Sequence, residues 1–132
     1  MLVERPVYAR TLEIACTAAN AQAIGDPAEE GDHIGPLFDA VQCEHVQVMI
    51  AKGIEGRARL LAGSLGRPDG LTEALQSGWF VRPTVFCDVT PDMAIWREEN
   101  SGPVLVITPF DTDAEGIAMA NDTDYGLAVV YI

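Results

Sequence analysis

Apolar residues recur at helical spacing in three long segments of the chain. Residues 8–24 carry apolar side chains among good helix formers and predict one amphipathic helix that ends at Gly25. Residues 39–53 repeat the pattern at spacings of three and four, with Asp39 as the expected N-cap. Residues 112–121 predict a third helix, because Thr112 and Glu115 have the spacing of a capping box.

Four other segments have the apolar, β-branched or aromatic composition of strands. The run at residues 104–110 is apolar on both faces, as expected for a strand buried between layers of helices. Pro83 cannot donate to a strand ladder, so the strand around it is expected at an edge or a bulge. The run at residues 127–132 is uniformly apolar and has no polar cap. The predicted strands are residues 59–63, 79–86, 104–110 and 127–132.

The order of these elements predicts the fold class. Loops rich in Gly, Pro and Asp are expected at residues 25–36 and 63–70, and Thr90 and Pro91 predict a short helix over residues 91–99. Helices alternate with buried strands over most of the chain, which is typical of an α/β protein. We therefore expect a layered, mostly parallel sheet with flanking helices, formed by residues 1–132 as a single domain.

Charge and composition exclude several classes of partner. Twenty Asp and Glu against eight Lys and Arg give a net charge of −12, which repels nucleic acid and anionic lipid. No apolar run approaches the roughly 20 residues that cross a bilayer, and the first ten residues have no secretory pattern, so we expect a cytoplasmic protein. Three cysteines at wide, irregular spacing fit neither a disulfide framework nor a metal site, which predicts reduced thiols.

Six short motifs occur in the order and at the spacing typical of one enzyme family. The downstream motifs, at residues 82–86, 98–104 and 120–128, read Arg-Pro-Thr-Val-Phe, Glu-Glu-Asn-Ser-Gly-Pro-Val and Ala-Asn-Asp-Thr-Asp-Tyr-Gly-Leu-Ala. The upstream motifs, at residues 25–27, 34–37 and 42–46, read Gly-Asp-Pro, Ile-Gly-Pro-Leu and Gln-Cys-Glu-His-Val. With these motifs the chain resembles the aldehyde dehydrogenase superfamily almost from end to end.

The resemblance implies a subunit with a nucleotide-binding domain, a catalytic domain and a small oligomerisation arm, and this chain is similar to part of the catalytic domain. It implies NAD or NADP as cofactor. In the family that the chain resembles, a cysteine thiolate attacks an aldehyde, hydride passes to the nicotinamide, and a glutamate-activated water releases the acid. The resemblance places the nucleophile a few residues before Met1, and the base and an oxyanion asparagine further upstream. It therefore predicts a truncated dehydrogenase that is inactive alone, with no catalytic residue in this chain.

The same resemblance indicates two cofactor-binding residues. Glu99 is similar to a family glutamate that binds the nicotinamide ribose, and Gln42 to a family glutamine that reaches the adenine-side ribose. The sequence departs from the family at Asn100 and Ser101, which replace an isoleucine and a phenylalanine that packs near the nicotinamide. Each candidate also has a simpler interpretation, as a solvated carboxylate at a helix end or a solvated glutamine on a helix surface. His45, beside Gln42 on the same helix face, is a weaker candidate.

Other candidate sites have less support. Cys43 and Cys87 do not match the position of the family nucleophile and are expected to be small buried hydrophobes. The acidic loop at residues 26–35 lacks the order of a calcium loop, and no Gly-x-Gly-x-x-Gly follows a predicted strand. We therefore expect no metal site and no complete dinucleotide site in this chain.

Two alternatives to a truncated enzyme stay open. An exposed apolar strand templates pairing, so the chain is alternatively a non-catalytic assembly module that pairs through residues 127–132. Its partner is then a second copy, forming a homo-oligomer, or a full-length paralogue. The other alternative is the product of a gene fragment with no selected role.

Overall fold

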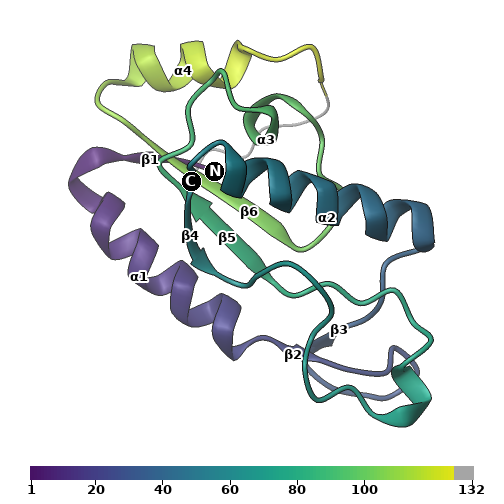
Figure 1. Cartoon of the computed structure of the whole chain (residues 1–132). Coiled ribbons are helices and arrows are strands. Elements are labelled where there is room, and N and C mark those ends of the chain that lie inside the picture. Colours follow the sequence, from purple (N-terminus) through teal and green to yellow (C-terminus); the bar gives the residue numbers. More distant parts are fainter. Residues whose placement is uncertain (127–132) are drawn as a thin grey trace.

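A four-stranded sheet forms the centre of the computed structural model, which describes residues 1–126 (Figure 1). The strand order is β1-β6-β5-β4, and the strands span Leu2–Glu4, Val104–Phe110, Thr84–Cys87 and Arg59–Ala62 respectively. β1, β6 and β5 run parallel, whereas β4 pairs with β5 in the antiparallel direction. The expected α/β class with a mostly parallel sheet is confirmed. The strand predicted at residues 127–132 lies outside the described residues.

Helices cover both faces of this sheet (Figure 1). α1 (Arg5–Ala21) lies on one face, and α2 (Ala40–Glu55) and the short α3 (Ala94–Arg97) lie on the other. Alternate residues of β5 point to opposite faces, as the pleat requires. Phe86 packs on the α2 side, whereas Val85 and Cys87 pack on the α1 side, and all three are buried. The sheet is therefore the shared wall of two apolar cores.

Two helix starts agree with the sequence pattern. The Asp39 carboxylate accepts a hydrogen bond of 2.7 Å from the Gln42 backbone N–H, which caps α2 and fixes the position of its first turn. In α4 (Asp113–Asn121), Thr112 Oγ1 accepts from the Glu115 N–H at 3.2 Å. The Glu115 carboxylate in turn accepts from the Asp111 N–H at 2.7 Å. Both caps were predicted, and both are confirmed.

Other element boundaries differ from the prediction. α1 begins at Arg5 instead of residue 8, because Pro6 has no N–H to satisfy and suits the first turn of a helix. β1, which precedes it, was not predicted. α1 ends at Ala21. β2 (Ala23–Ile24) then pairs in parallel with β3 (His33–Ile34), so a short strand pair joins the two ends of the loop that was expected to be irregular.

The segments before β5 and around α3 are also less regular than predicted. β5 begins only at Thr84, since the Trp79 carbonyl accepts from the Leu37 N–H at 2.8 Å and joins no strand. The helix expected over residues 91–99 shrinks to α3. Thr90 does not cap it, because its hydroxyl donates to the Asp92 carboxylate at 2.6 Å, and Met93 is the N-cap.

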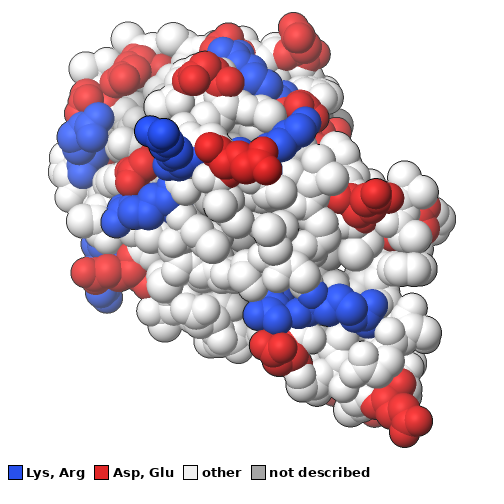
Figure 2. Space-filling model, viewed as in Figure 1, with Lys and Arg blue, Asp and Glu red and all other residues white. Residues whose placement is uncertain are grey.

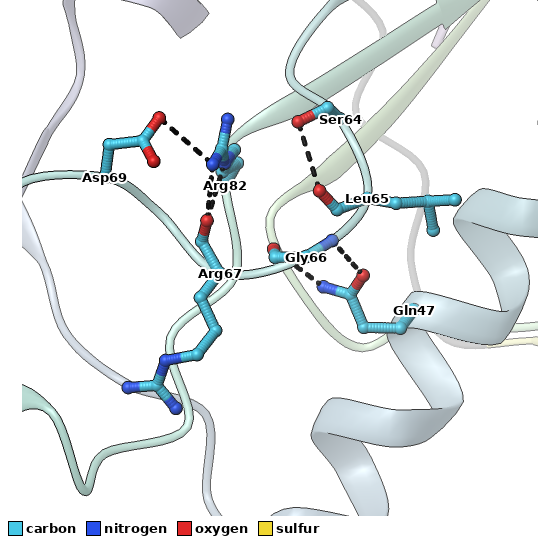
Figure 3. A network of polar contacts seen from close by, with 7 residues as sticks. All are labelled: Gln47, Ser64, Leu65, Gly66, Arg67, Asp69 and Arg82. Atoms are coloured by element: carbon cyan, nitrogen blue, oxygen red, sulfur yellow. Dashed lines mark hydrogen bonds and ion pairs between the residues drawn. The ribbon is translucent and has the colours of Figure 1, made fainter.

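The glycine-rich loop at residues 63–70 is held by two side chains (Figure 3). The Gln47 amide donates to the Gly66 carbonyl at 3.3 Å and accepts from the Gly66 N–H at 2.7 Å. The Arg82 guanidinium donates twice to the Arg67 carbonyl, at 2.8 and 2.5 Å, and pairs with Asp69 at 3.1 Å. The loop after β4 is thus tied to α2 and to the segment before β5.

No helix within residues 1–126 combines the length and the apolar character that crossing a membrane requires.

Candidate functional site

The segment between α3 and β6 lies against the first turns of α2. Gln42 and His45 stand one turn apart on that helix and face the segment together. Gln42 Nε2 donates to the Ser101 carbonyl at 2.8 Å, and His45 Nε2 lies 3.1 Å from the Glu99 carbonyl oxygen, at hydrogen-bond distance. Residues 99–101, which we call the α2-bound segment, are therefore fixed to the helix through two backbone carbonyls.

The carboxylate of Glu99 is exposed and is oriented by its neighbour. Ser101 Oγ donates to Glu99 Oε1 at 2.6 Å, a length typical of a hydroxyl bound to a charged carboxylate. The preceding Glu98 has a different partner, since its carboxylate pairs with Lys52 at 3.0 Å. Of the two adjacent glutamates, Glu99 has no ion pair among the described residues.

Asn100 lies between Glu99 and Ser101 in the sequence and is half-buried. Its amide nitrogen and oxygen are both buried, and neither has a hydrogen-bond partner in the described part of the chain. A Cβ added at Gly102 would lie 2.8 Å from Val46 and 3.7 Å from the Asn100 amide oxygen. The backbone therefore approaches α2 too closely for any side chain at residue 102.

The structure thus brings the two predicted site residues together, although not through direct contact. Ser101 connects Glu99 and Gln42. Its hydroxyl donates to the Glu99 carboxylate, and its carbonyl accepts from the Gln42 amide. His45, the weaker candidate, joins through the Glu99 carbonyl. Ser101 was noted in the sequence only as a departure from a family motif. The spacing of three between Gln42 and His45 was the available signal that both side chains face the same segment.

Cys16 and Cys87 lie in the α1-side core, whereas Cys43 follows Gln42 on α2, and none of the three is paired. Cys87 is fully buried at the end of β5, where Arg59 Nε donates to its sulfur at 3.0 Å. Burial raises the pKa of the Cys87 thiol, so the reactive thiolate is disfavoured there. Cys16 and Cys43 are half-buried and pack against the two cores. The expectation of a buried hydrophobe is confirmed for Cys87 and only partly for Cys43.

Tyr8 and Asp88 complete a second polar cluster around Cys87, at the carboxyl end of β5. The Tyr8 hydroxyl lies 3.3 Å from the Asp88 carboxylate, which pairs with Arg59 at 2.9 Å. Burial raises the pKa of Tyr8 to about 12. This cluster is built from groups that already bind one another. Within residues 1–126 no three His, Cys, Asp or Glu side chains converge as metal ligands.

The surface charge limits the kinds of group that the candidate site can bind. Most basic side chains on the face shown in Figure 2 lie beside acidic ones. Lys52 pairs with Glu98 at 3.0 Å, and Arg97 pairs with Asp122 at 2.7 Å. The candidate site therefore offers carboxylate and hydroxyl groups suited to hydrogen-bond donors, and Lys52, which contacts the adjacent Glu98, is paired with that residue.

Comparison with known proteins identifies the family. The model of the aldehyde dehydrogenase family matches residues 1–131. The chain belongs to the aldehyde dehydrogenase family. It is 47% identical over 105 residues to 3-succinoylsemialdehyde-pyridine dehydrogenase of a Pseudomonas species, a match that covers 80% of this chain and 21% of that protein. The chain thus spans about a fifth of the length of this curated relative.

Solved structures of the family contain the same fold. Aldehyde dehydrogenase from Bartonella henselae superposes with a TM-score of 0.90 at 42% identity, over 96% of this chain and 26% of that one. A Mycobacterium tuberculosis aldehyde dehydrogenase complexed with NAD⁺ superposes with a TM-score of 0.86 at 44% identity, over 96% of this chain and 25% of that one. The match confirms the family resemblance stated from the motifs.

Proposed function

We propose that this chain is a catalytic-domain portion of an NAD(P)-dependent aldehyde dehydrogenase and forms one wall of the cofactor cleft. In the parent subunit the reaction is the oxidation of an aldehyde to a carboxylic acid. The observation that carries the proposal is the exposed Glu99 carboxylate, held by Ser101 on a segment bound to α2. A similar enzyme from M. tuberculosis was crystallised with NAD⁺, which supports the choice of cofactor.

The residues present fit the sugar part of such a cofactor. An ionised carboxylate has two oxygens and about four lone-pair directions, of which Ser101 uses one at Glu99. The carboxylate therefore retains capacity for the two vicinal hydroxyls of a ribose. When bound, the nicotinamide ring would accept the hydride removed from the substrate. The role of this chain's own residues is to bind and orient the sugar of that group.

The three cysteines support the proposal that this chain does not turn over aldehydes by itself. A nucleophilic cysteine needs a thiolate and access to substrate. Cys87 is buried and its pKa is raised, whereas Cys16 donates to the Leu61 carbonyl at 3.2 Å within the α1-side core. Cys43 packs against the α2-side core. None of them adjoins Glu99 in the hydrogen-bond network described above.

The test is a titration of the purified chain with NADH, followed by backbone chemical shifts. We expect shift changes at residues 99–102 and at the start of α2, and at least about tenfold weaker binding for Glu99→Gln. Glu98→Gln is the matched control and should bind as the parent chain does. Equal affinities for both variants, or no binding by the parent chain, would contradict the proposal. Steady oxidation of simple aldehydes by the chain alone would contradict the absence of turnover.

The assembly alternative, with a second copy or a full-length paralogue as partner, rests on residues 127–132. These lie outside the described part of the chain, so the pairing stays a prediction. Light scattering across a range of concentrations tests it, since a constant monomer mass would exclude self-pairing. The cytoplasmic location likewise stays a prediction.

A further inference from the structure

The short contact between Ser101 and Glu99 joins two exposed side chains on one stretch of backbone. Ser101 Oγ and Glu99 Oε1 are 2.6 Å apart, at the short end of the range for hydrogen bonds between a hydroxyl and a carboxylate. An exposed glutamate otherwise samples several rotamers about its side-chain bonds. The hydroxyl therefore restricts the Glu99 carboxylate before any ligand arrives.

The backbone beneath this pair is also restricted. Gln42 holds the Ser101 carbonyl at 2.8 Å, and His45 lies 3.1 Å from the Glu99 carbonyl oxygen. Gly102, the next residue, packs against the fully buried Val46 of the same helix, and a Cβ added there would lie 2.8 Å from the Val46 side chain. Donor and acceptor of the short contact are thus carried on one segment that a single helix holds in place.

One of these contacts involves the side-chain amide of Gln42. One N–H of this amide donates to the Ser101 carbonyl at 2.8 Å, which fixes the direction of the amide and leaves its second N–H and its oxygen available. This contact gives Gln42 a structural role, because it holds the α2-bound segment to the helix.

We infer that Ser101 is a positioning residue for Glu99, and that Gln42 supports this position by holding the Ser101 carbonyl. The nature of the ligand, a nucleotide with a ribose diol, rests on the proposed function. The positioning itself does not depend on it. A preorganised acceptor loses less side-chain freedom on binding and so binds a diol more tightly.

The first experiment needs no ligand. Side-chain ¹³C relaxation and three-bond couplings of Glu99 are measured in the parent chain, in Ser101→Ala and in Ser101→Thr, which keeps the hydroxyl. We expect one dominant Glu99 rotamer in the parent chain and in Ser101→Thr, and averaging in Ser101→Ala. Ser64→Ala is the control, since the Ser64 hydroxyl bonds the Leu65 carbonyl in another loop. Equal order of Glu99 with and without the Ser101 hydroxyl would overturn the inference.

The second experiment measures NADH affinity in a double-mutant cycle. Ser101→Ala should weaken binding about three- to tenfold, the effect expected for loss of one hydrogen bond. In a Glu99→Gln background the same change should have much less effect, because Ser101 acts through the carboxylate. Additive losses would overturn the positioning role. If the parent chain binds no NADH, the proposed function fails, and the ligand-free measurement still decides the positioning.

Discussion

The buried amide of Asn100 predicts that this residue lowers the stability of the chain. Neither amide atom has a hydrogen-bond partner among the described residues, and both are buried. Mutational data place the cost of an unsatisfied buried polar group at about 1–3 kcal/mol. Asn100 is only half-buried as a residue, so we expect Asn100→Leu to raise the free energy of unfolding by about 1–2 kcal/mol. For a chain of this size that corresponds to a rise in Tm of roughly 3–8 °C.

The backbone gives no reason for an asparagine at this position. Arg57 and Asp88 are the non-glycine residues with positive φ within residues 1–126, so Asn100 is not in the left-handed region. Urea denaturation followed by circular dichroism measures the change. Asn100→Asp keeps the shape but adds a charge, and it should lower stability. If Asn100→Leu leaves the unfolding midpoint unchanged or lowers it, the amide is satisfied and the reasoning is refuted.

Three further predictions follow from other sites. Thr108 Oγ1 is buried without a partner among the described residues, so Thr108→Val should raise the free energy of unfolding by about 0.5–1.5 kcal/mol in urea melts, and a loss would contradict this. Gly63 has φ of +81°, and an added Cβ would lie 2.4 Å from the Pro83 carbonyl oxygen. Gly63→Ala should therefore cost at least about 3 kcal/mol, whereas Gly66→Ala, with positive φ but open space, should cost about 1 kcal/mol. Equal costs in the same melts would refute the steric argument. The raised pKa of Tyr8, about 12, means that the folded state favours the neutral phenol. Stability from this term is present below pH 10 and is lost between pH 10 and 12, by about 1 kcal/mol after allowance for solvent screening. Melts at pH 9 and 11 should show part of this loss in the parent chain and a smaller one in Tyr8→Phe.

The sequence pattern predicted long elements better than short ones. α2 and β6 were predicted because their apolar residues repeat over several turns or on both faces. The helix predicted over residues 91–99 is shorter in the structure because the Thr90 hydroxyl bonds Asp92, a local alternative to capping. β2 and β3 have two residues each, and their pairing depends on a contact across the loop that no periodicity records.

The residues of the candidate site were predicted, but their contacts were not. Motifs pointed to Glu99 and Gln42, and the fold brings them to one segment. The structural roles of Gln42 and His45 were not predictable, because both use backbone carbonyls as acceptors. Every residue has a backbone carbonyl, so composition and spacing do not show which carbonyls will accept these hydrogen bonds.

The two residues that depart from the family motif have opposite physical consequences in this structure. At residue 101 a small hydroxyl is exposed and donates to Glu99, so the polar substitution creates a contact. At residue 100 the amide is buried with no partner among the described residues, so the polar substitution carries a cost. The effect on stability and the effect on the Glu99 rotamer should therefore be independent of one another. Asn100→Leu should stabilise the chain and leave the Glu99 rotamer unchanged, whereas Ser101→Ala should free the Glu99 carboxylate and change stability by no more than about 0.5 kcal/mol, as is usual at exposed positions. If both variants altered both quantities, residues 99–101 would act as one cooperative unit and not as two independent positions.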